Sequence, residues 1–346
     1  MEHQARGLDH AAHAVRDLDA AAKIYRNLGF TVGARNRHPW GTHNHVVQLP
    51  GFFIELLTMA EPDKLGDDGF STQFASFADD FAKRHEGLAL LILQSQSAGG
   101  DVADFRAAGI SASDVMRFER EAKKPDGKTV KVGFSLAFAA DQHAPDIHFC
   151  TCQQHFPENF WNPEFQKHAN GAKTIAGVVL VADKPSAHRD FLRAYSGASH
   201  AEEYADDLRF ELPRGIIDVM TPATFTRRYG LAAPATKNSA RLAALRIAVD
   251  DTAPIKSCLI AAGIPLATGG SCRRRRRAWP CSSRIPGRFA CRFWARPWYS
   301  RGTHDPEKAC PRPDRGWVPV FGIDHAQTGK LTPKGPRFMF RPTRGF

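Results

Sequence analysis

The pattern of apolar and polar residues predicts that the chain opens with a strand, a helix and further strands. Residues 8–15 form an apolar run of strand length. Residues 18–28 carry apolar positions at helical spacing, with Asp17 or Asp19 as the N-cap and Gly29 at the end. Strands follow, the last of them over residues 52–56. The opening segment is therefore predicted to be one strand–helix–strands unit.

The same order of elements returns three more times along the chain. Each later unit begins with an apolar strand, continues with a helix and reaches a glycine. The predicted strands cover residues 87–93, 175–182 and 242–249, and the helices cover residues 101–108, 185–194 and 253–262. In the second unit, alternating apolar residues at 130–138 and a run at 147–152 predict two further strands.

An internal repeat supports this division. Residues 48–56 (QLPGFFIEL) match residues 211–219 (ELPRGIIDV) at a constant offset, so that Asp218 is the counterpart of Glu55. We predict an α+β fold of four βαβββ units, the last incomplete, which pair into curved mixed sheets that enclose a cleft. The predicted domains are 1–172 for the first two units, 173–270 for the next two, and a tail over 271–346.

Composition and charge separate the tail from the rest of the chain. The formal net charge is +11, yet residues 271–346 hold 18 of the 47 Lys and Arg residues and only 4 of the 36 acidic ones. The periodic apolar pattern ends near Gly270, just before five consecutive arginines. A nucleic-acid-binding arm is one interpretation. We favour a disordered or frameshift-derived segment, because its Arg, Pro and Trp content is typical of a GC-rich gene translated out of frame.

The hydropathy of the chain and its cysteine content bear on the compartment in which the protein is found. No run of 18 apolar residues occurs and the N-terminus lacks an apolar signal core, so we expect a cytoplasmic protein without a membrane partner. The body contains only three of the seven cysteines, Cys150, Cys152 and Cys258, without CxxC spacing. This usage suits a reducing compartment and argues against a disulfide framework.

Several short motifs together resemble one known family. They are residues 8–10 (LDH), 28–32 (LGFTV), 41–44 (GTHN), 53–56 (FIEL) and 151–162 (TCQQHFPENFWN). Over roughly residues 7–265 the chain resembles the glyoxalase-like branch of the vicinal oxygen chelate superfamily.

The resemblance implies a divalent metal, Zn, Ni, Mn or Fe(II), held by the first and last strands of paired units. In the first unit these positions fall on His10 and Glu55. In the second unit the first-strand position falls on Leu90, which cannot bind a metal, and the last-strand position falls on His148. His10, Glu55 and His148 would form a set of two imidazoles and a carboxylate that leaves positions open for substrate.

The residues themselves leave alternatives open. Taken alone, His10 could equally be a core histidine. Glu55 lies between apolar neighbours, where a carboxylate is costly unless it is paired or bound to a metal, and we expect it to act in catalysis. His155 competes with His148 as a ligand and is a candidate general base, since an unperturbed histidine titrates near about 6.5.

A second group of residues is expected to line the substrate pocket. His43 and His45 share a strand face, which could be the pocket or its rim, and His168 lies in a turn-like segment. Asp218 lacks histidine partners, so we expect the second half to be structural or to shape the substrate site. The predicted pocket residues are His43, His45, Gln154, Phe156, Trp161 and His168.

Together these features predict a metal-dependent enzyme that acts on a small substrate with adjacent oxygens. A lyase or isomerase is the first choice and an extradiol-type dioxygenase the variant. A metal-free protein that binds or sequesters a small molecule is the alternative, favoured by Leu90. We expect a small-molecule partner and no nucleic acid, with a homodimer left open.

Overall fold

The first predicted unit forms the start of a large sheet. The computed structural model describes residues 5–123, 127–205, 207–237 and 239–264, together with three short strand backbones further on. The N-cap of the first helix is Asp17, whose side chain accepts a hydrogen bond from the Ala20 amide at 2.9 Å. The unit consists of β1 (Leu8–Ala14), α1 (Leu18–Asn27), β2 (Asn36–Arg37), β3 (Thr42–Leu49) and β4 (Phe52–Met59).

The second unit repeats this order with one additional short strand. It consists of β5 (Gly87–Gln94), α3 (Ala98–Ala107), β6 (Ser111–Ala112), β7 (Met116–Lys123), β8 (Thr129–Ala140) and β9 (His148–Gln154). Between the two units the chain forms η1 (Pro62–Lys64), the π-helical η2 (Phe70–Ala75) and α2 (Ser76–Arg84). The sequence pattern did not predict these helical segments.

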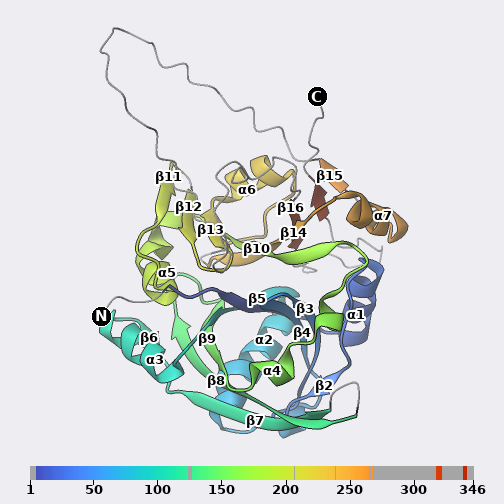
Figure 1. Ribbon diagram of the computed structural model, residues 1–346. Coiled ribbons are helices and arrows are strands. Elements are labelled where there is room, and N and C mark those ends of the chain that lie inside the picture. The colour runs from blue at the N-terminus through green and yellow to red at the C-terminus, as the bar shows by residue number, and fades with distance from the viewer. Residues whose placement is uncertain are drawn as a thin grey trace, which may run out of the picture.

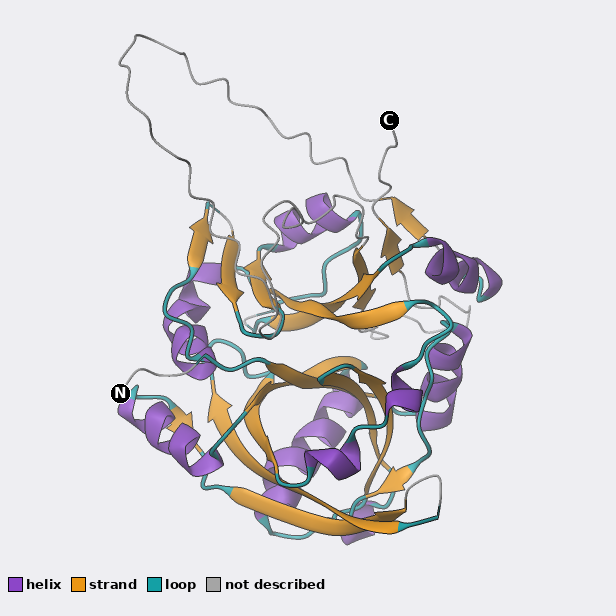
Figure 2. Cartoon of the chain, in the orientation of Figure 1, coloured by secondary structure: helices purple, strands orange, loops and turns teal. Residues whose placement is uncertain are grey.

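The two units join into one nine-stranded mixed sheet through β1 and β5. These strands pair antiparallel, with Ala11 opposite Leu91 at the centre of the shared register. β4 pairs parallel to β1 and β9 pairs parallel to β5, so the two units are related by an approximate twofold axis between β1 and β5. The sheet curves around α2, which lies on its concave face (Figure 2).

The third and fourth units form a second, six-stranded sheet. The short elements α4 (Pro157–Phe160) and η3 (Pro163–Gln166) lead into it. Its elements are β10 (Ala172–Val181), η4 (Pro185–His188), α5 (Arg189–Ser196), β11 (Glu202–Tyr204), β12 (Asp207–Glu211), β13 (Ile216–Met220), α6 (Pro222–Tyr229), β14 (Arg241–Val249) and α7 (Ala253–Ala261). Gly197 ends α5 at a φ of 68°, as its predicted role as the helix stop requires.

The tail contributes strands to this half of the molecule. β16 (Trp317–Phe321) pairs antiparallel with β14, while β15 (Leu266–Thr268) and β17 (Phe338–Phe340) pair with each other. β16 thus gives β14 of the predicted incomplete fourth unit a neighbouring strand. The prediction of a disordered or frameshift-derived tail otherwise concerns residues outside the described ones, and the predicted domain boundaries stay predictions.

The two sheets pack back to back, and each concave face points away from the other (Figure 1). Apolar side chains such as Leu91 of the first sheet and Leu245 of the second belong to one buried cluster. Tyr195 of α5 is fully buried there, and its hydroxyl donates to the carbonyl oxygens of Leu91 and Cys150 at 2.7 and 2.8 Å. The fold is thus α+β, built from repeated modules in two curved mixed sheets, as predicted.

No helix among the described residues is long and apolar enough to span a membrane.

Candidate functional site

A pocket opens on the concave face of the first sheet. It encloses a volume of about 650 Å³, which includes open solvent at its mouth. Residues of both units line it, together with η2 and α4, and most of the lining side chains are aromatic or aliphatic. Its polar lining residues are His10, Asn36, His38, Asn44, Glu55 and Arg120.

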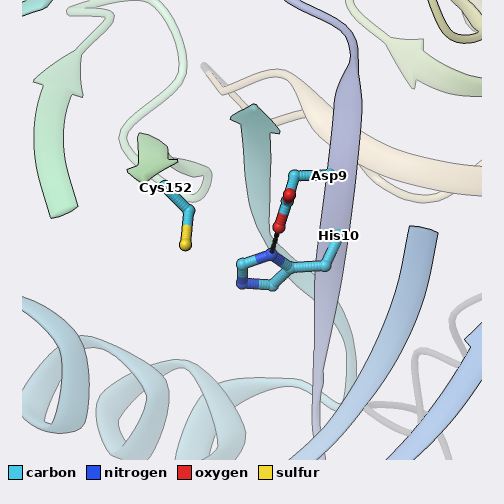
Figure 3. Close-up of side chains that lie close together, drawn as sticks. All are labelled: Asp9, His10 and Cys152. Atoms are coloured by element: carbon cyan, nitrogen blue, oxygen red, sulfur yellow. Dashed lines mark hydrogen bonds and ion pairs between the residues drawn. The ribbon is translucent and has the colours of Figure 1, made fainter. Parts of the chain in front are cut away.

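His10 is held in the pocket by its neighbour in the sequence. The pairing of β1 with β5 is irregular between Leu8 and His10, which lets Asp9 turn its carboxylate toward the His10 ring (Figure 3). His10 Nδ1 lies 2.6 Å from Asp9 Oδ1, and the ring stacks on Phe53 with centroids 4.1 Å apart. Because Nδ1–H donates to Asp9, Nε2 keeps its lone pair for a ligand, a proton or a metal ion.

Glu55 is the carboxyl group of the pocket. It comes from β4, is 5% exposed and accepts a hydrogen bond from Asn44 Nδ2 at 2.5 Å. Burial raises the pKa of Glu55 above its usual 4.5, more than His10 and the Asn44 hydrogen bond lower it. Glu55 therefore holds its proton at higher pH than an exposed glutamate does, which suits a group that gives and takes protons near neutral pH.

A chain of hydrogen bonds connects Glu55 to a cation across the pocket wall. Asn44 Oδ1 accepts from Asn36 Nδ2 at 2.9 Å, and Asn36 Oδ1 accepts from Arg120 Nη2 at 3.4 Å. The two amides are thereby fixed in orientation, with Asn44 donating to Glu55.

His38 is the second histidine of the pocket and stays neutral. Its Nδ1 lies 2.8 Å from the Thr42 hydroxyl, and its Nε2 lies 3.4 Å from Asn44 Nδ2. Burial, followed by the charge of Arg120, lowers the pKa of His38 to about 3. Since its ring stacks on Trp40 at 4.9 Å, His38 serves as a neutral part of the wall.

A group of three metal-ligating side chains lies at the inner end of the site. The ligand atoms of Asp9, His10 and Cys152 lie within 4.8 Å of one another, and Figure 3 shows the Cys152 sulfur beside the His10 ring. Burial and the nearby Asp9 carboxylate raise the pKa of the Cys152 thiol well above its usual value. Cys152 is thus a neutral thiol in the absence of a metal.

The approximate twofold axis corrects the expected ligand position in the second unit. The axis relates His10 of β1 to Leu90 of β5, as predicted, and it relates Ala12 to Ile92. Glu55 of β4 pairs with Ala12, and Cys150 of β9 pairs with Ile92. Cys150, two residues beyond His148, therefore occupies the position of Glu55.

His148 itself does not line the pocket that holds His10 and Glu55. Its ring packs on Phe77 at 4.1 Å and on Phe138 at 4.9 Å. Burial lowers the pKa of His148 to about 4, so it is a neutral core histidine.

The two histidines of β3 point away from the pocket, contrary to the pocket prediction. Asn44 and Val46 of the same strand line the pocket, so the side chains of His43 and His45 lie on the opposite face. His43 Nε2 pairs with Glu61 at 2.8 Å, and His45 Nδ1 donates to the Gly33 carbonyl oxygen at 2.8 Å.

His155 also lies outside the pocket, on the far side of β8. Phe134 and Leu136 line the pocket, so Ser135 between them points to the other face, where its hydroxyl lies 2.8 Å from His155 Nε2. Gln154 does not line the pocket either, but its Nε2 donates to Asp9 Oδ2 at 3.2 Å and so helps to hold the partner of His10.

In the aromatic segment after β9, the pocket is lined by Phe160 and not by Trp161, the residue that was predicted. Phe160 lines the pocket, whereas Trp161 contacts Phe53 edge-on at 6.0 Å. Phe156 packs over Gly133. His168 Nε2 donates to the Gln48 carbonyl oxygen at 2.8 Å and thereby connects the segment between η3 and β10 to the first unit.

Sequence reasoning missed four polar residues of the pocket, Asn36, His38, Asn44 and Arg120. Asn36 and His38 belong to no motif, and Asn44 belongs to the GTHN motif, which by itself assigns it no role in the pocket. Arg120 had a readable signal, since it follows Met116 and Phe118 at alternate positions of a strand and therefore shares their inward face.

Comparison with known proteins agrees with this architecture. Residues 8–195 match the family described as a glyoxalase-like domain, which is more than half of the chain. The chain therefore belongs to this family, within the vicinal oxygen chelate superfamily. None of the curated proteins compared with it matches.

Several solved structures are similar to this chain at low sequence identity. A hypothetical protein from Staphylococcus aureus is 16% identical, with a TM-score of 0.51, over 62% of this chain and 86% of that one. A mutant 4-hydroxymandelate synthase from Streptomyces coelicolor is 12% identical, with a TM-score of 0.47, over 75% and 76%. Methylmalonyl-CoA epimerase from Mycobacterium tuberculosis is 18% identical, with a TM-score of 0.32, over 45% and 92%.

Proposed function

We propose that the protein is a glyoxalase-like enzyme that moves a proton within a small substrate bearing adjacent oxygens, in the pocket of His10 and Glu55. A lyase or isomerase reaction fits this chemistry best. The observation that carries the proposal is the environment of Glu55. It is a buried carboxyl group with a raised pKa at a pocket wall, and no Lys or Arg pairs with it among the described residues.

Its counterpart in the other half of the molecule shows what a structural carboxylate looks like in this fold. Asp218 is also buried, yet it pairs with Arg209 at 2.8 Å and with Arg246 at 3.0 Å. Two guanidinium groups neutralise that charge. Glu55 lacks such cations and opens on a pocket, so its cost to stability is better explained by a use in proton transfer.

Glu55 would act first as a base and then as an acid. Its carboxylate accepts a proton from the carbon beside a substrate carbonyl, and the electron pair of the broken C–H bond passes into an enolate. The resulting carboxylic acid then returns its proton to the neighbouring atom, so that the net change is an isomerisation. In a lyase reaction the enolate would instead expel a leaving group from the β-carbon, and the carboxylic acid would protonate that group. Asn44 holds the carboxylate in place, and the aromatic walls exclude water from the reacting atoms.

His10 would bind the oxygenated end of the substrate. Its Nδ1–H is fixed on Asp9, so Nε2 is oriented without freedom of tautomer. Nε2 can accept a hydrogen bond from a substrate hydroxyl or take up its proton, with the Asp9 carboxylate stabilising the imidazolium. Gln154 of β9 in turn donates to Asp9 of β1, so residues of both strands fix the orientation of the His10 ring.

A divalent metal fits the donors in part. His10 and Glu55 would hold it, with the Asp9 contact to Nδ1 typical of a metal-bound histidine. Cys152, whose sulfur lies within 4.8 Å of the ligand atoms of His10 and Asp9, is a further donor that would have to lose its proton, so a thiophilic ion such as Zn²⁺ suits the set better than Mn²⁺. Once bound, the ion would polarise the substrate oxygens.

A metal-free binding protein is the second candidate function. The approximate twofold axis places Leu90 and Cys150 where the second unit would supply ligands, and both are fully or almost fully buried apolar side chains. A pocket with half of a ligand set and aromatic walls can hold a small molecule without reacting with it.

A turnover screen separates the two candidates. The full chain, with and without added Zn²⁺, is incubated with small 2-oxo and 2-hydroxy compounds, and their consumption is followed by NMR. Wild type and His155→Ala should consume the same compound, while Glu55→Gln should bind it without turnover. Binding by the wild type with no consumption of any compound would favour the second candidate.

A further inference from the structure

An arginine lies on the inward face of an otherwise apolar strand segment at the pocket. β7 alternates between half-buried and exposed positions along its whole length. Phe118 and Arg120 occupy successive inward positions and both line the pocket. Arg117 and Glu119 lie on the outward face and pair with each other through the Arg117 guanidinium. The two arginines of this strand therefore meet different environments.

Arg120 has only neutral acceptors among the described residues. Its Nη1 donates to the Glu121 carbonyl oxygen at 3.2 Å and its Nη2 to Asn36 Oδ1 at 3.4 Å, both long contacts for a guanidinium. A half-buried guanidinium without a carboxylate is costly, and its fork of donors matches the oxygens of a carboxylate or a phosphate. The neutral state of His38 leaves Arg120 as the positive charge of this wall.

The strand spacing gives the scale of the pocket between Asn36, the partner of Arg120, and Glu55. Asn36 on β2 pairs with Asn44 on β3, and β3 pairs with β4, which carries Glu55. Two strand spacings separate the backbones of Asn36 and Glu55, which is about 10 Å across the sheet. A ligand with one aromatic ring and a substituent at each end fits that scale.

Aromatic side chains form another part of the pocket lining. Trp40 stacks on Phe70 at 4.5 Å, and Phe118 meets Trp40 edge-on at 4.9 Å, so these rings form a continuous apolar wall of the pocket. Such a wall favours a planar apolar group over a flexible polar one.

We propose that Arg120, held by Asn36, forms a carboxylate subsite, and that the ligand of this pocket is a flat aromatic molecule with a carboxylate at Arg120 and an oxygenated group at Glu55. The placement of the oxygenated end rests on the proposed function, whereas the carboxylate subsite does not. A single guanidinium suits a singly charged carboxylate. A phosphate dianion would meet no second cation there.

A matched pair of probes tests the subsite by binding alone. 4-Acetylbenzoate carries a carboxylate and a carbonyl at opposite ends of one ring, and 4-acetylbenzamide is its neutral isostere. Dissociation constants are measured by calorimetry for the full-length wild type, Arg120→Gln and Arg117→Gln. The wild type should bind the carboxylate about tenfold or more tightly than the amide. Arg120→Gln should lose this preference, and Arg117→Gln, on the outward face of the same strand, should keep it.

Three results would overturn the subsite: no binding of 4-acetylbenzoate by the wild type, equal binding of the two probes, or an unchanged preference in Arg120→Gln with an unchanged melting temperature. The test does not depend on turnover. Suppose that Glu55→Gln keeps the carboxylate preference and that the wild type consumes no substrate. This result would support the subsite and contradict the proposed reaction.

Discussion

Removing the Asn44 amide should destabilise the protein more at alkaline than at acidic pH. Asn44 donates to Glu55 Oε1 at 2.5 Å, and this bond matters most when Glu55 is ionised. Because burial raises the pKa of Glu55, the folded state holds its proton to higher pH than the unfolded chain, where the value is near 4.5. In the wild type, the contribution of Glu55 to stability therefore falls as the pH rises from 4.5 through the raised pKa.

The magnitude follows from the hydrogen bond that is lost. A hydrogen bond to a charged group contributes about 1.5–3 kcal/mol, and one to a neutral group about 0.5–1.5 kcal/mol. Asn44→Ala should therefore cost about 1–2 kcal/mol more above the pKa of Glu55 than below it. The other contacts of Asn44 do not add to this difference. His38, with a pKa of about 3, stays neutral over the range, and Asn36 does not titrate.

Urea denaturation at a series of pH values from about 4 to about 10 measures the effect for the wild type, Asn44→Ala, Glu55→Gln and the double variant. Glu55→Gln should also be more stable than the wild type at the highest pH, because it keeps the shape of the side chain without the buried charge. In the Gln background, Asn44→Ala should cost the same at every pH. An equal loss at every pH in the wild-type background would refute the coupling of the Asn44 hydrogen bond to the ionisation of Glu55.

Three further outcomes follow from the structure. Tyr195→Phe removes a buried hydroxyl with two acceptors and leaves no cavity, so the free energy of unfolding should fall by about 1–2 kcal/mol in thermal or urea denaturation, and no loss would contradict the hydrogen bonds. His10→Ala should abolish binding of Zn²⁺ to the full chain in equilibrium dialysis, while His148→Ala should retain it; equal loss in both would place the ion elsewhere. Leu90→His should strengthen Zn²⁺ binding, since Leu90 is the counterpart of His10, and unchanged affinity would count against the twofold relation of ligand positions.

The elements that form the site were predictable because their periodicity is strong. The apolar run at β1 and the helical spacing of α1 both matched the structure within about two residues. Burial of Glu55 among apolar neighbours also indicated its role in the site. His10 required the family resemblance, since one histidine in an apolar strand has several explanations.

The assignment of His148 failed for a reason that alternation cannot detect. A slip of two residues leaves every side chain on the same face of the strand, so His148 and Cys150 are equivalent in the sequence pattern. Only the pairing of β5 with β9, combined with the twofold relation of β1 and β5, distinguishes them.

The error at β3 has a different physical origin. Its first four residues, Thr42 to His45, are polar on both faces, so the pattern does not define which face points inward. Tertiary pairing placed Asn44 inward and His45 outward. In strand β7, by contrast, half-buried and exposed positions alternate regularly. This alternation places Arg120 on the same inward face as Met116 and Phe118.

Proton exchange at a substrate carbon tests most directly whether Glu55 moves a proton in this pocket. Aryl-substituted 2-oxo acids such as phenylpyruvate, and any compound found in the turnover screen, are incubated with the full chain in D₂O, and loss of the proton beside the carbonyl is followed by NMR. The wild type should exchange it faster than the uncatalysed rate, and Glu55→Gln should bind the compound without exchange. Equal exchange by the wild type and Glu55→Gln, or none above background by the wild type on compounds that it binds, would contradict the assignment of this pocket as the site of catalysis.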